Sequence, residues 1–281
     1  MSDWPTLLRA PENADLLDDW FASLAARLLL GSKLLVAGRD HRLVEVELYY
    51  WSTAHADPFA HRDPLQSQTG QWYFHRAHGV YRGGSFKGLD LTFGQGESSG
   101  GILLRGLETP AGSLIDGPSL CVDYLLGATG TTAVAELDRA IDKRCAWIEG
   151  NPLILEARDA SDMRSIFRSP RVGLSLKRAA GSPEATRFLM RPYRFLTEPR
   201  RTKKGKTHLV LSLHVRGDGV ETIQTITNCP RRSIERYLAD FERGRNEGEF
   251  SPYIGVDLGR SELCKLYGVW FTHWGFPRES R

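Results

Sequence analysis

The strongest constraint on the fold is a strand-like segment, RLVEVELYYW, at residues 42–51. Side chains along a strand point to opposite faces in turn, so this alternation predicts one apolar face and one face that carries Glu45, Glu47 and Tyr49. An apolar, β-prone segment at residues 32–37 precedes it, and residues 38–41 between them have the composition of a turn. The two segments therefore predict a hairpin with acids on one of its faces.

The composition is that of a globular protein and argues against a disordered or membrane-spanning chain. Hydrophobic residues make up 41% and charged residues 25% of the 281 residues, close to the average for globular domains. The longest apolar runs are far shorter than the roughly 20 residues of a spanning helix. The N-terminal segment is acidic where a secretion signal would be basic. We therefore expect a cytoplasmic protein with no membrane partner.

Helical patterns complete the expected fold. Residues 15–30 have apolar positions at helical spacing, acids in the first turns and Gly31 after the end, which predicts an amphipathic helix. A second helix is predicted from Pro118 to a stop at Gly127, and a third at residues 134–141. Segments 102–107 and 153–157 predict further strands. We expect an α+β fold, with a curved, mostly antiparallel, open-barrel-like sheet and surrounding helices in a single body.

The chain changes character near residue 198. Residues 1–197 predict one domain, and residues 198–281 an extension packed on it. Within the extension, 209–215 and 221–227 predict two strands, and the segment from Pro230 predicts a helix. Residues 187–206 carry eight Lys or Arg and one acid. Such a run is either a solvated face or a surface that meets phosphates.

Arg105 is an anomaly in the apolar segment 102–107. A guanidinium in apolar surroundings needs an acidic partner, because an unpaired buried charge is costly. Either Glu108 or the row formed by Glu45 and Glu47 could supply that partner.

Residues 71–92 combine aromatic side chains with glycines and with Arg76, Arg82 and Lys87. Stacking on bases together with phosphate contact would require this mixture. An ordinary sheet with aromatic core residues explains the same composition equally well.

The histidines and cysteines raise the question of a metal site. A hydrolase or nuclease centre could draw its ligands from several residues of the first half: His55, His61, His75, His78, Asp57, Asp63 and Glu47. Their spacings match no standard metal motif. The four cysteines lie far apart without a CxxC pair, which indicates buried reduced thiols. We expect no metal and no cofactor.

Several segments in series resemble the alkyladenine (3-methyladenine) DNA glycosylase family. They are LAARLLLGSKLLVA, RLVEVELYYW, DPFAHRD, ILLRGLE, DGPSLC, RVGLSLKR and RFLMRPYRFL, in the same order and at similar spacing. The resemblance covers roughly residues 20–196, so the chain looks like a divergent member with a C-terminal extension. Residues 1–197 would then be a glycosylase-like catalytic domain.

The resemblance implies a chemistry in which a modified base is flipped out of DNA and an activated water hydrolyses its N-glycosidic bond. By motif, Glu47 takes the place of the general base and Arg105 that of the arginine that holds the water and the carboxylate. The base pocket would be lined by Tyr49, His61, Tyr81, Asp90 and Trp51. Asp90 falls near an asparagine of the family, so a carboxylate replaces an amide there. No lysine in these motifs stands as an amine nucleophile, which predicts a monofunctional enzyme without lyase chemistry.

The implied partner is double-stranded DNA, bound by a monomer that would be nucleoid-associated when on DNA. In the family an aromatic side chain at a hairpin tip fills the gap left by the flipped base, and here that tip is expected near Gly83 and Gly84. Residues expected to contact DNA are basic or aromatic: Arg82, Phe86, Lys87, Arg191, Arg194, Arg200, Arg201, Lys203 and Lys204.

The departures from the family pattern, at Asp90 and at Tyr50 and Trp51, indicate a pocket of altered shape and polarity. The expected substrate is an alkylated purine or a larger modified base, such as those that mark viral DNA, in repair or in antiviral defence. Two alternatives remain: a catalytically silent nucleic-acid-binding homologue, and a metal-dependent hydrolase or nuclease.

Overall fold

The computed structural model describes residues 3–158, 163–177 and 182–275. Two compact units make up the chain: unit 1 comprises Met1–Ile166 and Phe195–Thr197, and unit 2 comprises Phe167–Arg194 and Glu198–Arg281. Residues 167–194 thus group with the C-terminal region. Within the described residues, no helix has the length and apolar character needed to cross a bilayer. The combination of helices with a mostly antiparallel, open sheet is the α+β class that the sequence predicted.

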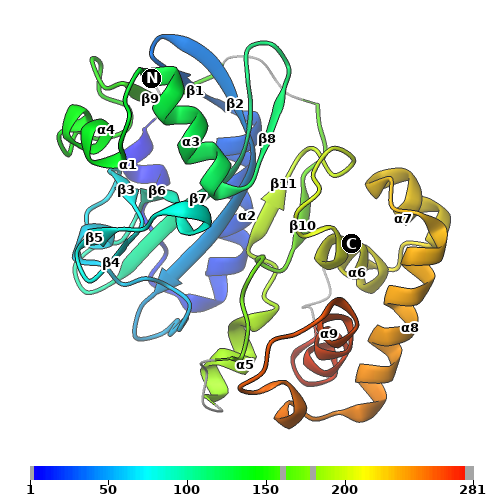
Figure 1. Ribbon diagram of the computed structural model, residues 1–281. Coiled ribbons are helices and arrows are strands. Elements are labelled where there is room, and N and C mark those ends of the chain that lie inside the picture. Colours follow the sequence, from blue (N-terminus) through cyan, green and yellow to red (C-terminus); the bar gives the residue numbers. More distant parts are fainter. Residues whose placement is uncertain (1–2, 159–162, 178–181, 276–281) are drawn as a thin grey trace. The chain divides into compact units, whose positions relative to one another are not determined.

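Unit 1 is built on a mostly antiparallel sheet (Figure 1), in which neighbouring strands follow the order β11, β2, β7, β6, β3. Strand β1 pairs with both β2 and β9, and β8 pairs with β7. The strand bounds are β1 Ser32–Val36, β2 Arg39–Trp51, β3 Trp72–Phe74, β6 Leu89–Thr92, β7 Ser99–Glu108, β8 Leu114–Asp116, β9 Leu153–Ala157 and β11 Arg194–Leu196. A separate two-stranded ribbon consists of β4 Arg76–Ala77 and β5 Val80–Tyr81.

The predicted hairpin is confirmed, with a tighter turn than expected. Val36 pairs with Arg39, so Ala37 and Gly38 alone make the turn. Both have positive φ, 46° and 78°. Two-residue turns of this kind match the right-handed twist of the flanking strands, which explains why the hairpin closes here. The consequence is that β2 begins three residues before the predicted strand.

Helices cover both faces of the sheet (Figure 1). On one face, α2 (Leu17–Leu30) packs Phe21 edge-on against Tyr50 of β2, with the ring centroids 6.4 Å apart. On the other side α3 (Pro118–Thr129) packs against β7 and β8. The remaining helices of unit 1 are α1 Trp4–Leu7 and α4 Val134–Ile141. The predicted stop of α3 at Gly127 is wrong, because the helix continues to Thr129 and ends at Gly130, which has a positive φ of 71°.

Unit 2 is mainly helical. Its elements are β10 Phe167–Ser169, α5 Pro183–Leu189, α6 Lys206–Arg216, α7 Val220–Thr227, α8 Arg231–Glu247 and α9 Arg260–Trp274. The helix predicted after Pro230 is confirmed as α8, but the two strands predicted at 209–215 and 221–227 are wrong, since both segments are helical.

The error has a physical reason. Residues 207–213 of α6 are all buried, because this helix contacts α7, α8 and α9. A helix that is covered all round shows a continuous apolar run, which periodicity cannot distinguish from a buried strand. Glycines with positive φ, Gly205 and Gly217, delimit it on either side and were the available signal.

The packing of α8 and α9 depends on two glycines. A Cβ on Gly244 would lie 1.9 Å from the carbonyl oxygen of Lys265, and one on Gly268 would lie 2.0 Å from that of Phe241. The two helices run in the same direction, because the contacts advance along both in the same order. The Tyr237 ring lies near Arg260, Phe241 near Tyr267, and Arg245 near Phe271. The backbones therefore approach so closely that no side chain fits at either crossing.

We expect Gly268→Ala to lower the free energy of unfolding of unit 2 by about 1–3 kcal/mol, since the new methyl group forces α8 and α9 apart. The matched control is Gly127→Ala in α3, where a Cβ meets nothing within 4 Å; this change should raise stability by about 0.5–1 kcal/mol. Urea unfolding followed by circular dichroism measures both. Equal stability of Gly268→Ala and the parent would contradict the close crossing.

Candidate active site

A polar row crosses the sheet of unit 1 from β2 to β3. Glu47 on β2 pairs with Leu103 on β7, Leu103 pairs with Asp90 on β6, and Asp90 pairs with Tyr73 on β3. Directly paired residues of adjacent strands share one face of a sheet. The cross-strand register therefore brings together Glu47, Asp90 and Tyr73, which are 43 and 17 residues apart in the sequence, on the face opposite to Tyr50.

Arg105 lies between two glutamates. Its Nε is 2.8 Å from Glu45 Oε1 and 3.2 Å from Glu47 Oε1, and all three residues are buried. Burial by itself would lower the pKa of Arg105, but the charges of Glu47 and Glu45 outweigh burial and raise it. The acidic partner of Arg105 is therefore the row of two glutamates; the other candidate, Glu108, pairs with Arg42 at 2.6 Å.

A bulge in β7 sets this arrangement. Val46 pairs with Leu104 and Glu45 with Gly106, so Arg105 is the extra residue on its strand. Bulges re-aim a side chain out of the regular alternation. The absence of a Cβ on Gly106 also matters, since one would lie 2.9 Å from a methyl of Val44 and 3.0 Å from the Cβ of Glu45. Because Gly106 has no side chain, β2 and β7 can pair closely beside Arg105.

The second oxygen of Glu47 is held by Tyr49. The Tyr49 hydroxyl donates a hydrogen bond of 2.8 Å to Glu47 Oε2. With Arg105 at Oε1, the carboxylate has a fixed orientation. Hydrogen bonds from an arginine and a phenol suit the ionised form of a carboxylate, which is the form that can accept a proton or stabilise a nearby positive charge.

Asp90 belongs to a second hydrogen-bonded group. Its Oδ1 is 2.8 Å from His75 Nε2, and its Oδ2 accepts a hydrogen bond of 2.9 Å from Gln66 Nε2. Gly101 makes room for this group, since a Cβ there would lie 2.5 Å from Asp90 Oδ2, and Gly88 does the same beneath the ring of His75. The sequence had placed Asp90 against a substrate base; in the structure both of its oxygens are engaged by protein groups. His75 was named only as a possible metal ligand and Gln66 was not predicted, because the sequence around Asp90 does not indicate which distant residues it contacts.

His61 contacts this group through its ring. The centroids of the His61 and His75 rings are 4.3 Å apart with the planes inclined at 67°. The residue keeps an exposed surface, but the side of its ring that faces Tyr73 and His75 is covered. The pKa of His61 is lowered to about 4, first by this local loss of water and second by the charge on His75. Burial likewise raises the pKa of the neighbouring Tyr73. At neutral pH the His61 ring is therefore an uncharged aromatic surface beside the Asp90 group.

Tyr81 lies in a different cluster from the Glu47 row. Its hydroxyl donates a hydrogen bond of 2.6 Å to Asp138 of α4, and Arg76 Nη2 donates to the same carboxylate oxygen at 2.7 Å. The Arg76 guanidinium also covers the Tyr81 ring at 4.5 Å. These contacts fix the β4–β5 ribbon to α4. The contacts of Tyr81 therefore do not match the expected role, which was to stack on a flipped base.

The hairpin tip is also elsewhere than predicted. Ala77 pairs with Val80, so the turn lies at His78 and Gly79, both of positive φ. Residues 84–86, where the tip was expected, form a short 3₁₀ helix. The paired glycines at 83–84 suggested the wrong turn because a two-residue turn with positive φ needs only one glycine. Near the tip Val80 is 69% exposed, and Phe86 on the 3₁₀ helix is 71% exposed.

Residues 71–92 include both buried core aromatics and one exposed aromatic side chain. Trp72, Tyr73 and Phe74 of β3 are buried core residues, whereas Phe86 faces solvent. Lys87 forms an ion pair with Asp123, and Arg82 Nε donates to the carbonyl of Arg76 at 3.3 Å. A cation–π contact of 3.9 Å places the Arg62 guanidinium over Trp51. The exposed faces of these residues remain available to a ligand.

The basic residues predicted in unit 2 fall into two groups. Arg194 is fully buried and donates to Ser169 Oγ and to the carbonyl oxygens of Lys204 and Gly205, at 3.0–3.1 Å. This guanidinium holds unit 2 together and does not reach solvent. Arg191 is partly exposed, and the other predicted basic residues are exposed: Arg200, Arg201, Lys203 and Lys204.

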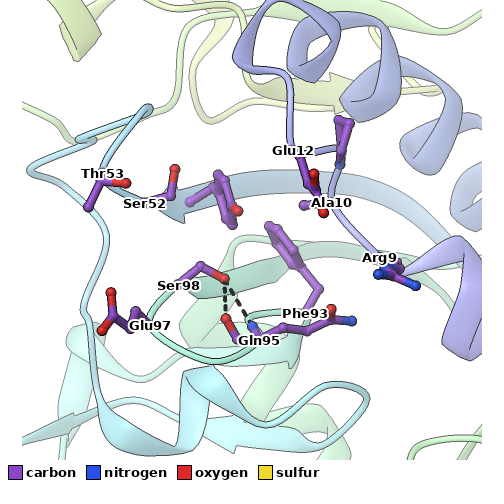
Figure 2. Close-up of a pocket in the computed structure, with 11 residues that line it drawn as sticks. Arg9, Ala10, Glu12, Ser52, Thr53, Phe93, Gln95, Glu97 and Ser98 are labelled. Atoms are coloured by element: carbon purple, nitrogen blue, oxygen red, sulfur yellow. Dashed lines mark hydrogen bonds between the residues drawn. The ribbon is translucent and has the colours of Figure 1, made fainter.

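A cavity of about 280 Å³ lies on the opposite side of β2 from Glu47, and Figure 2 shows its lining. Tyr50 and Phe93 form its aromatic wall, with ring centroids 5.5 Å apart and nearly parallel planes. The N-terminal segment contributes Arg9 and Glu12, and the loop before β7 contributes Glu97 (Figure 2). Because Tyr49 and Tyr50 point to opposite faces, this cavity is separate from the Glu47 row.

No group of three or more His, Cys, Asp or Glu side chains in the described part of the chain is placed to hold a metal ion. His55, one of the candidate ligands, has its Nδ1 3.0 Å from the carbonyl oxygen of Tyr50. The histidines of the other candidate pair separate, since His75 binds Asp90 and His78 occupies the ribbon turn. The hypothesis of a metal-dependent nuclease thus finds no ligand set among these residues.

Comparison with known proteins supplies one relationship. No family model matches the chain. The "Uncharacterized protein L759" of Acanthamoeba polyphaga mimivirus is 31% identical over 218 residues, which cover 72% of this chain and 97% of the viral protein. The chain belongs to the family of this viral protein. The similarity extends over nearly the whole viral protein, so this family shares more than an isolated motif.

We expect the imidazole of His61 to titrate near pH 4, well below its ordinary value of 6.5. Between these values the folded state binds fewer protons at His61 than the unfolded state, so the free energy of unfolding should rise with pH across this window and be unaffected by His61 above it. NMR titration of the ring signals, assigned by their loss in His61→Asn, measures the pKa. A midpoint at 6.5 or above would contradict the packing against His75.

Proposed function

We propose that this protein is a monofunctional DNA glycosylase, which flips a modified base out of double-stranded DNA and hydrolyses its N-glycosidic bond to leave an abasic site. The observation that carries the proposal is the Glu47 carboxylate, held at one oxygen by Arg105 and at the other by Tyr49. By motif, Glu47 and Arg105 correspond to catalytic residues of the alkyladenine DNA glycosylases that the sequence resembles, and Tyr49 to a residue of their base pocket.

The chemistry of this group suits glycosidic hydrolysis. As the bond from the sugar C1′ to the base nitrogen breaks, the base leaves with the bonding electrons and positive charge develops on the sugar. An oriented carboxylate stabilises that charge and accepts a proton from the water that attacks C1′. Arg105 keeps Glu47 aligned; no amine nucleophile is required, so the product is an intact strand with an abasic site.

The neighbouring groups supply what a flipped base needs. His61, uncharged at neutral pH, provides an aromatic surface to replace lost stacking. Gln66 Oε1 is buried and has no hydrogen-bond partner among the described residues; since Gln66 Nε2 bonds Asp90, this oxygen offers an acceptor for a donor group on the base. This polar wall favours a modified base that carries hydrogen-bond donors over a purely alkylated one.

The exposed apolar residues of the β4–β5 region provide the wedge that base flipping requires. Val80 beside the ribbon turn and Phe86 on the 3₁₀ helix both project into solvent, which is an unfavourable position for apolar side chains without a partner. Insertion between base pairs would bury them. Because the family includes a protein encoded by a virus, modified bases of viral DNA belong among the candidate substrates.

Glu47→Gln should abolish base release while DNA binding stays within about threefold of the parent, because the amide keeps the shape but cannot accept the proton. Base release from several natural DNAs, including modified viral genomes, is measured by mass spectrometry of the free bases. Glu156→Gln is the matched control and should keep full activity, because it removes a β9 carboxylate that pairs only with Lys33 of β1 among the ion pairs of the described residues.

Three outcomes would contradict this proposal. Full activity of Glu47→Gln would remove Glu47 as the base. Direct strand cleavage that a chelator stops would indicate a metal-dependent nuclease. Binding of every tested DNA by the parent protein without release of any base would indicate a silent nucleic-acid-binding homologue.

Asp90→Asn should change which bases are released more than it changes the rate for the best substrate. One oxygen becomes an NH₂ group, so either His75 or Gln66 loses its acceptor and the wall next to the base is rearranged. The ratio of released bases, compared between Asp90→Asn and the parent, is the measurement. Asp123→Asn, which breaks only the surface ion pair with Lys87, should leave the ratio unchanged; an unchanged ratio for Asp90→Asn would place Asp90 outside the specificity wall.

A further inference from the structure

Unit 2 contains a cavity of about 510 Å³ between α8 and the first turn of α9. Three arginines surround it, and the side chains that define it are Arg236, Tyr237, Asp240, Arg243, Arg260 and Ser261. A volume of this size exceeds that of a single small ion and falls in the range of small-molecule binding sites.

The convergence of these residues follows from the helix geometry. Arg236, Asp240 and Arg243 are spaced by four and three residues, so they lie on one face of α8. The glycine crossings bring α9 alongside this face in a parallel sense, with Arg260 as the first residue of α9 beside Tyr237. The first turn of α9 therefore opens into the cavity, together with the Ser261 side chain.

Positive charges outnumber negative charges at this site. Arg243 Nη1 pairs with Asp240 Oδ1 at 3.2 Å, but Arg236 and Arg260 form no ion pair with any described residue. Other arginines of the same helix are paired: Arg231 with Glu221 and Glu235, and Arg245 with Glu242. Arg236 and Arg260 thus face a cavity whose lining carboxylate, Asp240, already pairs with Arg243.

Both of these guanidiniums lie against the same ring. Arg236 Cζ is 5.6 Å and Arg260 Cζ 5.9 Å from the centre of the Tyr237 ring, which is only 6% exposed. The ring face stabilises each cation and limits its freedom. The nearest acid on α9, Glu262, folds back against Gly259 at the helix start. The two positive charges are consequently directed at the cavity.

We propose that this cavity binds the phosphate of a nucleotide-sized phosphate monoester. Two forked guanidiniums match a phosphate dianion in charge and in donor geometry, while the backbone N–H groups of the first turn of α9 and the Ser261 hydroxyl supply further donors. The remaining cavity volume accommodates the group that bears the phosphate. A free mononucleotide and the 5′-phosphate at the end of a DNA strand present this same chemistry.

Calorimetric titration of the full-length protein tests the proposal with three probes: inorganic phosphate, a mononucleotide, and a short DNA duplex with or without 5′-phosphates. We expect the double variant Arg236→Gln/Arg260→Gln to weaken binding of the mononucleotide or of the phosphorylated duplex at least tenfold. Arg232→Gln is the matched control, because Arg232 is exposed on the same helix and does not line the cavity; it should leave the affinity unchanged.

The arms of the experiment separate the two sources of phosphate. Arginine-dependent binding of the mononucleotide identifies a free nucleotide as a ligand, and binding that needs the 5′-phosphate of the duplex identifies a strand end. Equal loss in Arg232→Gln and in the double variant would overturn the proposal, since it would indicate non-specific attraction. It would also be overturned if neither phosphate monoester bound.

A second variant guards against a folding defect. Arg236→Lys keeps the charge but loses the forked donor, so it should weaken binding less than Arg236→Gln does. Circular dichroism should show the same helix content in all variants. The site lies in unit 2 and none of its residues has a role in base release, so both this result and the Glu47→Gln result can be read independently.

Discussion

The burial of Arg105 between Glu45 and Glu47 is the interaction on which the sheet of unit 1 depends. Three charged groups in a core lose their hydration, and only mutual contact at 2.8–3.2 Å offsets that loss. Their contact fixes the register of β2 against β7 at the point where both strands are irregular. A shift of one residue would send Glu47 and Tyr49 to the face that carries Tyr50. The same contact that stabilises the register therefore orients the proposed catalytic carboxylate.

Polar groups occupy this face because glycine leaves space for them. Gly101 faces Asp90 and Gln66, Gly88 lies under His75, and Gly106 stands beside Arg105. Each glycine removes a side chain from a position where the strand pairing would otherwise place one. The sheet thus combines a face packed on α2 through aromatic residues with a face that carries hydrogen-bonded acids, histidines and an amide.

Part of this structure could be predicted from the sequence, and part could not. The β1–β2 hairpin, α2 with its stop at Gly31, and the need of Arg105 for an acid all follow from short-range patterns, and all are present. Residues 209–215 were misread because a helix covered on all sides has no polar face, so its periodicity is lost. The ribbon turn was misplaced because two glycines at 83–84 gave a stronger local signal than His78 and Gly79. Asp90 was placed against the substrate because nothing near it in the chain reveals its partners His75 and Gln66.

The sequence by itself determined the local elements of unit 1 and the order of acids and tyrosine along one strand, because alternation is a property of neighbouring residues. Tertiary structure decided which distant groups meet. Arg105 reaches Glu45, 60 residues away, through cross-strand register, and Asp90 reaches Gln66, 24 residues away, because the 3₁₀ helix at Pro64–Ser67 packs beside β6. In unit 2, Arg236 and Arg260 share one ring only because Gly244 and Gly268 allow two helices to pack in contact. These contacts depend on packing between segments far apart in the chain, where no local pattern records the partner.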